Sequence, residues 1–546
     1  MIATSPHWCV PKFKTWLEEF LDSRWLYVAA LYPALISVPY FFLTQNYASP
    51  SRVVYVFGCT GVAGALCAFA FSQRVATVRR RANLYAGWIF GGLAVLYVLV
   101  MFYLAYGVRI TNGMGIVSDV ANFEQVLWAT ARGRFFYSSF NNGSILSGHF
   151  ALIYAPLSWL YSGFQNIGIV FATQTFLFAA TAAILYRWLR NFTSRFPALL
   201  FALSFLVSPA VVSQNFSLYL NHFAPFLWCA AAYAFWRRNL LTFMLYSIFC
   251  ALIQEDIAFS LLVFGLLAWL EKRSWQWRAF ATLFPMLWFG VGLFVIQQNA
   301  SVTGIALGGN FSEFGQTPEA IGQSMLAKPE IIFAKVFGHP LSKTLWVYEL
   351  TSPFLFVLPF LSPLVLAAFP DWAVFMFANR APEQYSVAWY YSLFIVTVLY
   401  TALVFVLAKL QTRFAPALQN RFVTLVSILL LCSNLAMLPL VISPDMFKTD
   451  DGSRMRAIQN ARAQIPDNAC VAVTYDIAQP FARRDELSIL GLQRDEIILN
   501  CQYIVLSARL VAGEVDAPNS LSQRIRTARD FALVSNENGI ELYTRR

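Results

Sequence analysis

Stretches of about 15 to 22 apolar residues recur from Trp25 to Val441, and they limit what this chain can fold into. A helix that crosses the hydrocarbon core of a bilayer needs about 20 such residues. Only 12% of the residues are charged and the mean hydropathy is +0.57, whereas about a quarter of the residues in soluble domains are charged. The sequence therefore predicts a mainly α-helical, polytopic bundle in a membrane.

Thirteen apolar segments are candidate membrane spans. They cover residues 25–43, 53–71, 86–106, 167–187, 197–213, 223–236, 241–255, 257–270, 279–298, 342–360, 363–379, 387–408 and 422–442. Several between 197 and 270 are short, so a different merging there stays open. With a cytoplasmic N-terminus, 18 Lys and Arg fall on the inner side and 8 on the outer side, as cytoplasmic loops require. The odd number of spans then makes the C-terminus extracytoplasmic.

The apolar segment 149–163 is interpreted as a helix in the membrane interface. It contains Pro156, and Tyr154 and Trp159 suit the headgroup region. Counting it as a span would also invert the charge bias of every later loop. At the N-terminus, no charged start precedes an apolar run with a small-residue cleavage site, so no cleavable signal peptide is expected. We therefore predict a multi-pass protein of the plasma (inner) membrane.

Charge separates the C-terminal segment from the rest of the chain. From residue 444 onward there are 13 Lys and Arg and 14 Asp and Glu, which is typical of a soluble domain. The basic excess elsewhere matches cytoplasmic loops, so no nucleic-acid partner is expected. The predicted parts are an N-terminal extension with two extra spans at 1–82, a membrane domain at 83–443 with long outer loops at 107–166 and 299–341, and an extracytoplasmic α/β domain at 444–546.

The C-terminal domain shows its own pattern. The sequence predicts a helix at 454–464, strands at 471–476 and 503–507, helix-like segments at 478–490 and 519–530, and a final hairpin that turns at Asn538-Gly539. Cys470 and Cys501 lie just ahead of the two strands. If these strands are neighbours, a disulfide is expected in an oxidising outer compartment, and two free buried thiols are the alternative.

Asp119 stands out in the first outer loop. A short helix is predicted to begin there, capped by Ser118, and to end before Gly133. Phe123 and Val126 belong to one apolar face at helical spacing. At the helix N-terminus the helix dipole stabilises the Asp119 carboxylate. From spacing alone, a role restricted to capping the helix stays open.

Two further polar pairs lie at predicted outer membrane borders. The run SLYLNHFAPF contains Asn221 and His222, and the run ALIQEDIAFS contains Glu255 and Asp256. Adjacent carboxylates at a border cost desolvation energy unless they face water, a partner charge or a cavity. An exposed turn between two helices is the alternative for this acidic pair. The sequence contains no GxxxxGK[ST], HExxH, GxSxG or CxxC motif, so these familiar phosphate, zinc, hydrolase and redox motifs give no guidance.

Several of these runs together resemble a known family. The runs are DVANFEQVLW from Asp119, GRF from Gly133, GHF from Gly148, APL from Ala155, Asn221-His222, Glu255-Asp256-Ile257, Ile465-Pro466 and YIVL from Tyr503. They closely resemble a family of predicted membrane proteins filed as domain of unknown function twenty seventy-nine. That family is similar to the GT-C glycosyltransferases, and the likeness covers roughly residues 86–506.

The resemblance implies an inverting glycosyltransferase that moves sugar from a polyprenyl-phosphate carrier to an acceptor on the outer face. Asp119 is then the expected catalytic base. The expected substrate-binding residues are Gln125, His149, His222, Glu255 and Asp256. The lipid-linked sugar is the only co-substrate implied, and the acceptor (glycan, lipid or protein) is not identified. The sequence has Asn221 where an acid is expected beside His222, which leaves the acceptor and the use of a divalent metal open.

Two other classes stay open. One is a lipid or solute transporter or flippase, which usually carries ionisable residues near the membrane midplane. Few charges lie within the predicted spans, and Asp371 is the deepest of them. The other class is a non-catalytic scaffold whose tail recruits partners. Convergence of Asp119, His149, His222 and Glu255 on one cavity favours the enzyme, and scatter favours the scaffold.

Overall fold

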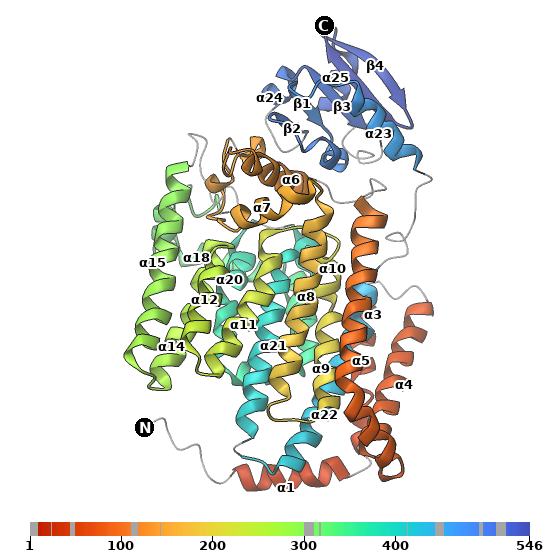
Figure 1. Ribbon diagram of the computed structural model, residues 1–546, viewed down its shortest axis with the longest axis vertical. Helices are drawn as coiled ribbons and strands as arrows, with labels where there is room; N and C mark the ends of the chain where they lie inside the picture. The colour runs from red at the N-terminus through yellow and green to blue at the C-terminus, as the bar shows by residue number, and fades with distance from the viewer. Residues whose placement is uncertain are drawn as a thin grey trace.

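Long helices run side by side along the molecule, and a smaller α/β domain lies on one end of the bundle (Figure 1). We call this the capped end and the opposite one the uncapped end. The computed structural model describes residues 9–22, 25–43, 50–110, 118–141, 143–299, 311–315, 318–379, 381–411, 413–442, 452–490, 495–508 and 520–546. Helix α1 (Cys9–Asp22) lies across the uncapped end.

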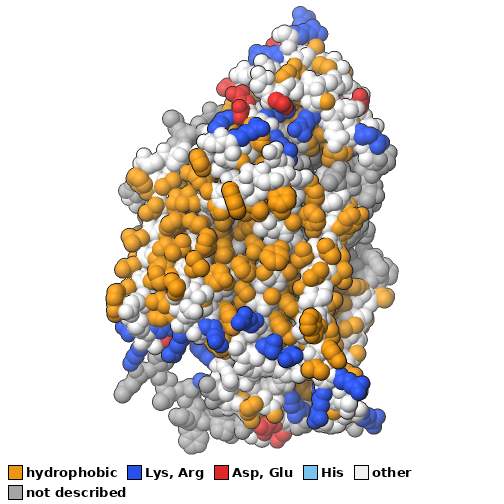
Figure 2. Space-filling view, in the orientation of Figure 1, with side chains coloured by type: hydrophobic (Ala, Val, Ile, Leu, Met, Phe, Trp, Pro, Cys, Tyr) orange, Lys and Arg blue, Asp and Glu red, His pale blue; other side chains and the backbone are white. Residues whose placement is uncertain are grey.

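Within the described part, six helices are long and apolar enough to cross a membrane. They are α4 (Pro50–Phe71), α5 (Ala76–Phe102) with its π-helical extension η2 (Tyr103–Ile110), α8 (Gly168–Leu189), α15 (Trp275–Asn299), α21 (Tyr390–Leu410) and α22 (Pro416–Met437). A broad belt of hydrophobic side chains covers the bundle between its two ends (Figure 2). The chain is thus a multi-pass membrane protein, while thirteen crossings and the orientation stay predictions.

Shorter helices complete the bundle. They are α2 (Trp25–Ala29), α3 (Tyr32–Leu43), α9 (Arg195–Leu206), α10 (Pro209–Gln214), α11 (Ala224–Trp236), α12 (Leu240–Ala251), α13 (Glu255–Ser260), α14 (Leu262–Leu270), α17 (Pro318–Ala327) and α18 (Pro329–Phe337). Most residues of α21 and α22 are buried, so these two helices form the centre around which the others pack.

The predicted span at 342–360 is not a continuous helix, whereas the span at 363–379 corresponds to one shorter apolar helical segment, Pro363–Phe377. Helix α19 (Pro340–Thr351) ends at three 3-10 segments, η6 (Ser352–Phe354), η7 (Leu358–Leu361) and η8 (Pro363–Ala368), before α20 (Phe369–Phe377). Pro353, Pro359 and Pro363 explain the breaks, because proline has no N–H to donate and its ring clashes with the preceding turn. Hydropathy alone does not register this interruption.

Helices α6 (Ser118–Ala131) and α7 (Tyr154–Phe164) lie across the capped end (Figure 1). With 11 residues, α7 is too short to span a bilayer, which agrees with the interfacial interpretation of 149–163. Helix α6 stops before Gly133, whose φ of +85° suits glycine, as the sequence predicts. The predicted cap by the Ser118 side chain lies outside the described side chains.

The C-terminal domain is built on a five-stranded sheet in the order β2-β1-β3-β5-β4. Its elements are α23 (Ser453–Ala463), β1 (Val471–Val473), β2 (Leu487–Ile489), α24 (Asp495–Asn500), β3 (Tyr503–Ser507), α25 (Leu521–Thr527), β4 (Phe531–Glu537) and β5 (Ile540–Arg545). The parallel β1–β3 pair and the β4–β5 hairpin at Asn538-Gly539 are confirmed. Strand β2 instead falls in the segment 478–490, which was expected to be helix-like.

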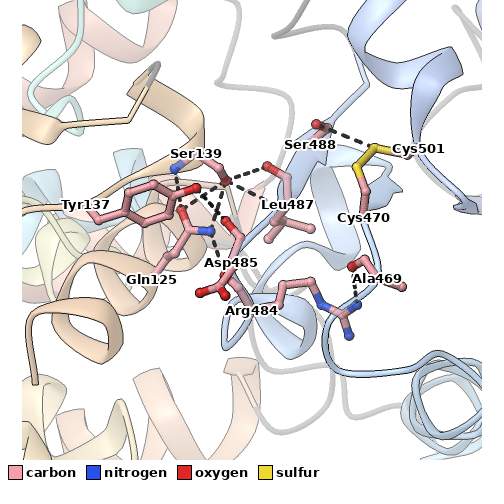
Figure 3. The surroundings of a disulfide bond; sticks show 10 residues. All are labelled: Gln125, Tyr137, Ser139, Ala469, Cys470, Arg484, Asp485, Leu487, Ser488 and Cys501. Atoms are coloured by element: carbon pink, nitrogen blue, oxygen red, sulfur yellow. Dashed lines mark hydrogen bonds between the residues drawn. A yellow bond between two sulfur atoms is a disulfide. The ribbon is translucent and has the colours of Figure 1, made fainter. Parts of the chain in front are cut away.

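The C-terminal domain is fastened to α6 through Gln125. Its amide nitrogen donates to the Arg484 carbonyl at 2.9 Å, and its oxygen accepts from the Ser139 N–H at 2.9 Å. The Ser139 hydroxyl in turn donates to the carbonyl of Leu487 in β2 at 2.7 Å (Figure 3). These bonds join the loop after α6 to the edge of the sheet and fix α6 relative to the domain.

Glu124 supplies a second, charged attachment. Its side chain is fully buried, and it accepts hydrogen bonds from the hydroxyl of Tyr161 in α7 at 2.9 Å and from Gln479 at 2.7 Å. Arg483 of the C-terminal domain pairs with the same carboxylate at 2.8 Å. Because a buried charge is stable only when paired and hydrogen-bonded, Glu124 holds α6, α7 and the domain together.

The structure joins Cys470 and Cys501 in a disulfide, with a Cα separation of 4.9 Å and a sequence separation of 31. We expect both thiols of the denatured protein to resist alkylation until a reductant is added, as peptide mass spectrometry would show. Replacing both by serine should cost the domain about 3 to 4 kcal/mol on the chain-entropy model. Labelling of both residues without reductant would contradict the bridge.

Candidate functional site

A polar cavity of about 220 Å³ opens at the capped end, under α6. Its lining comes from segments far apart in sequence: α6, the loop before α7, the loop before α11, the loop before α13, and the start of α21. The polar or aromatic residues that line it are Asp119, Asn122, Phe123, Asn141, His149, Tyr154, Tyr219, Asn221, Gln254, Tyr390 and Tyr391. The cavity therefore exists only when the bundle and the helices across its end are assembled.

Asp119 lies in the first turn of α6, half-buried at the cavity wall. The hydroxyl of Tyr219 donates to its Oδ2 at 2.6 Å. Burial raises the pKa of the Asp119 carboxyl above its usual value, and the Tyr219 hydrogen bond acts in the opposite direction because it stabilises the charged form. The result is a carboxylate with higher proton affinity than an exposed aspartate.

Tyr219 is itself held from two sides. Its ring stacks on Tyr390 with centroids 4.2 Å apart, and its backbone N–H donates to Nδ1 of His222 at 3.3 Å. Nε2 of His222 lies 3.0 Å from Oε1 of Gln214. Burial lowers the pKa of His222 to about 3, so this imidazole is neutral at ordinary pH. His222 does not line the cavity, but it contacts Tyr219, which does. Its position therefore suits a role in orienting Tyr219.

His149 lines the cavity opposite α6, and its side chain is 40% exposed. Its Nδ1 lies 3.1 Å from Oε1 of Glu255, while Oε2 of Glu255 accepts from the N–H of Phe150 at 2.9 Å. Burial acts to lower the pKa of His149, but the charge and hydrogen bond of Glu255 outweigh it, so the pKa is raised. A protonated imidazole can thus persist beside the cavity.

The remaining candidates lie around the cavity in different ways. Asp256 follows Glu255 and binds the N–H of Ile257 at 2.7 Å and Gln254 at 3.4 Å. Only Asp119 and His149 of the predicted residues line the cavity, with Glu255 in contact with His149. Gln125 faces the other side of α6 and binds the C-terminal domain, so the structure does not bring it to the cavity.

Sequence reasoning did not single out Tyr219, Gln254, Tyr390, Asn122 or Asn141, all of which line the cavity. Tyr219 and Gln254 lie within the two border runs that contain His222 and Glu255, so proximity to those residues was the available signal. Tyr390 begins a long apolar helix, and nothing in its local pattern distinguishes it from an interfacial aromatic residue. Among the described residues, no group of three or more His, Cys, Asp or Glu side chains is placed to hold a metal ion.

The structure is a helical bundle with a small α/β domain on one end and a polar cavity beneath that domain. These features define the class of protein as a polytopic membrane protein with a candidate site at one end of the bundle. The chain belongs to the family described as Predicted membrane protein (DUF2079), whose model matches residues 118–542. No curated protein sequence matches it. The family expected from the sequence motifs is thereby confirmed.

Solved structures show more distant similarity. ArnT from Cupriavidus metallidurans bound to undecaprenyl phosphate is similar at 12% identity and a TM-score of 0.44, over 84% of this chain and 98% of that one. Arabinofuranosyltransferase AftD from Mycobacteria is similar at 13% identity and a TM-score of 0.43, over 83% of this chain and 40% of that one. Membership of the family rests on the sequence match.

Replacing Tyr219 by phenylalanine should raise the pKa of Asp119 further, because the hydrogen bond that stabilises the carboxylate is lost. Carbodiimide labels the protonated carboxyl, so the labelling of the Asp119 peptide, followed by mass spectrometry across pH, reports this pKa. We expect the midpoint to move to higher pH in Tyr219→Phe. Tyr55→Phe, which removes a hydroxyl on α4, is the matched control. An unchanged or lower midpoint in Tyr219→Phe would show that this hydrogen bond does not lower the pKa of Asp119.

Proposed function

We propose that this protein is a membrane glycosyltransferase that moves a sugar from a polyprenyl-phosphate carrier to an acceptor at the capped end. The observation that carries the proposal is the shared cavity of about 220 Å³, which both Asp119 and His149 line. The Asp119 carboxylate suits proton removal, and the His149 imidazole suits binding of an anion. The GT-C resemblance of the motifs around these same residues supports this division of roles.

Asp119 acts as the general base. Its carboxylate takes the proton of an acceptor hydroxyl, whose oxygen attacks the anomeric carbon of the sugar. The bond between that carbon and the phosphate oxygen breaks, its electron pair leaves with the polyprenyl phosphate, and the anomeric configuration inverts. The raised pKa of Asp119 favours this role, because a base with higher proton affinity takes a proton from a hydroxyl more readily.

His149 binds the phosphate of the donor. Its Nδ1 is occupied by Glu255, so Nε2 is the ring nitrogen left to donate to a phosphate oxygen as charge develops on the leaving group. Glu255 is oriented by the Phe150 N–H and keeps the imidazole protonated. Asn122, Asn141 and Gln254 supply neutral amide groups, which suit sugar hydroxyls.

A transporter is the second candidate, because Asp371 is buried in α20 and its Oδ2 has no hydrogen-bond partner in the described part of the chain. Buried ionisable residues of this kind mark ion or substrate pathways in transporters. Purified protein in detergent separates the two classes, since a transferase consumes donor without a membrane barrier and a transporter does not. Mass spectrometry of lipids that copurify with the protein identifies the carrier and its sugar.

Asp119→Asn should lower sugar transfer by about 10² to 10⁴-fold, because the amide cannot accept the proton. Expression and binding of the lipid-linked donor should be retained. The measurement is release of polyprenyl phosphate from copurified or supplied lipid-linked sugar. Asp495→Asn, which removes an acid from an exposed ion pair in the C-terminal domain, is the matched control and should keep full activity. Near-normal turnover of Asp119→Asn would falsify the assignment.

The pH dependence of transfer should have two limbs. Activity falls at low pH as Asp119 becomes protonated, and it falls at high pH as His149 loses its proton. Because Glu255 raises the pKa of His149, Glu255→Gln should move the high-pH limb to lower pH and leave the low-pH limb in place. The profile of kcat/KM against pH is the measurement. A high-pH limb that does not move would remove His149 from phosphate binding while leaving the role of Asp119 intact.

A further inference from the structure

A basic pocket lies at the uncapped end, far from the transfer site. It is a cavity of about 300 Å³ between the end of α4, the start of α5, and the first turns of α9 and α22. Arg79, Arg80 and Arg421 line it, and none of its described lining residues is acidic. Lys and Arg side chains gather at this edge of the hydrophobic belt (Figure 2). The proposed transfer reaction uses none of these residues.

Backbone carbonyl groups hold two of the arginines at the pocket. Arg79 donates to the carbonyl oxygens of Ala70, near the end of α4, and of Ser72, which follows α4. Arg421 donates to the carbonyl of Leu21 in α1 at 2.6 Å. Arg80 is exposed. Within the described ranges, neither Arg79 nor Arg80 forms an ion pair with a carboxylate. In the described part of the chain, the charges of Arg79 and Arg80 are therefore not neutralised by a carboxylate.

Two asparagines add oriented donors. The side-chain oxygen of Asn83 accepts from the Phe196 N–H at 2.9 Å, and that of Asn420 accepts from the Ser194 N–H at 2.8 Å. With both oxygens bound to the start of α9, the amide nitrogens of Asn83 and Asn420 donate to no other described residue. Guanidinium groups and amide N–H groups thus converge on one cavity, which suits a ligand rich in acceptor oxygens, such as a phosphate.

The surface above the pocket is apolar. Arg80, Leu84 and Trp88 recur every four residues and so share one face of α5. Leu84 is 58% exposed and Trp88 is 83% exposed. An alkyl chain attached to a phosphate in the pocket would lie along this face, inside the hydrophobic belt. Basic pockets between membrane helices are known to bind phospholipid headgroups.

We propose that this pocket binds the phosphate of an anionic phospholipid, whose acyl chain lies along Leu84 and Trp88. The lipid joins α5 to α9 and α22 at the end of the bundle that the C-terminal domain does not hold. This binding site is independent of the transfer reaction, so either proposal can fail without the other.

The test is native mass spectrometry of the purified full-length protein with phosphatidylglycerol, with phosphatidylcholine of the same acyl chains, or with inorganic phosphate. We expect one phosphatidylglycerol to be retained and phosphatidylcholine to dissociate. Arg80→Gln should weaken phosphatidylglycerol binding by about five- to tenfold, since one arginine near a lipid phosphate contributes roughly 1 kcal/mol or slightly more. Arg81→Gln, the matched control, removes the same charge from the next, exposed residue outside the pocket and should leave binding unchanged.

Trp88→Ser provides a second variant that leaves every pocket donor in place. It should weaken phosphatidylglycerol binding through loss of contact with the acyl chain. Equal losses in Arg80→Gln and Arg81→Gln would show diffuse attraction to a basic surface and overturn the site. Displacement of the lipid by an equal concentration of inorganic phosphate would show a free-anion site and overturn the lipid assignment. Retention of phosphatidylcholine equal to that of phosphatidylglycerol would overturn the assignment to an anionic lipid.

Discussion

The buried carboxylate of Glu124 is the contact on which the capped end depends. Tyr161 of α7 and Gln479 and Arg483 of the C-terminal domain all bind it, so three separate parts of the chain meet at one charge. Loss of one partner of a buried ion pair commonly costs about 3–5 kcal/mol, although the partial exposure of Arg483 reduces this figure. Since Asp119 lies on the same helix, little more than one turn away, the position of the acid follows from this attachment.

The carboxylates of Glu255 and Asp119 differ in their hydrogen-bond partners. Glu255 accepts a hydrogen bond from a backbone N–H and pairs with His149, so it stabilises the charged form of the imidazole. Within the described part of the chain, Asp119 accepts one hydrogen bond, from the hydroxyl of Tyr219, and it lies at the wall of an open cavity. A carboxylate that lines the cavity can exchange a proton with a ligand there, whereas Glu255 is not among the lining residues. This contrast separates the proposed base from the residue that positions its neighbour.

Length and apolarity were enough to predict α5, α8, α15, α21 and α22, because long unbroken runs leave few alternatives to a spanning helix. The prediction failed between 342 and 360, where Pro353 and Pro359 break the apolar segment into short 3-10 turns. At the site, motifs led to Asp119 and His149, but the same motif run suggested that Gln125 binds substrate. Its partner Arg484 is 359 residues away in the chain, and a local pattern contains no information about such a contact.

The attachment of α6 to the C-terminal domain has a consequence for the timing of biosynthesis. Gln125 and Arg484 are separated by 359 residues. At about 5 to 20 residues per second, roughly 20 to 70 seconds pass between the synthesis of the two ends of this contact. During that interval a ribosome-bound chain already has α6 but none of the residues that fasten it. A nascent chain would therefore lack this attachment of α6 until Arg484 has been synthesised.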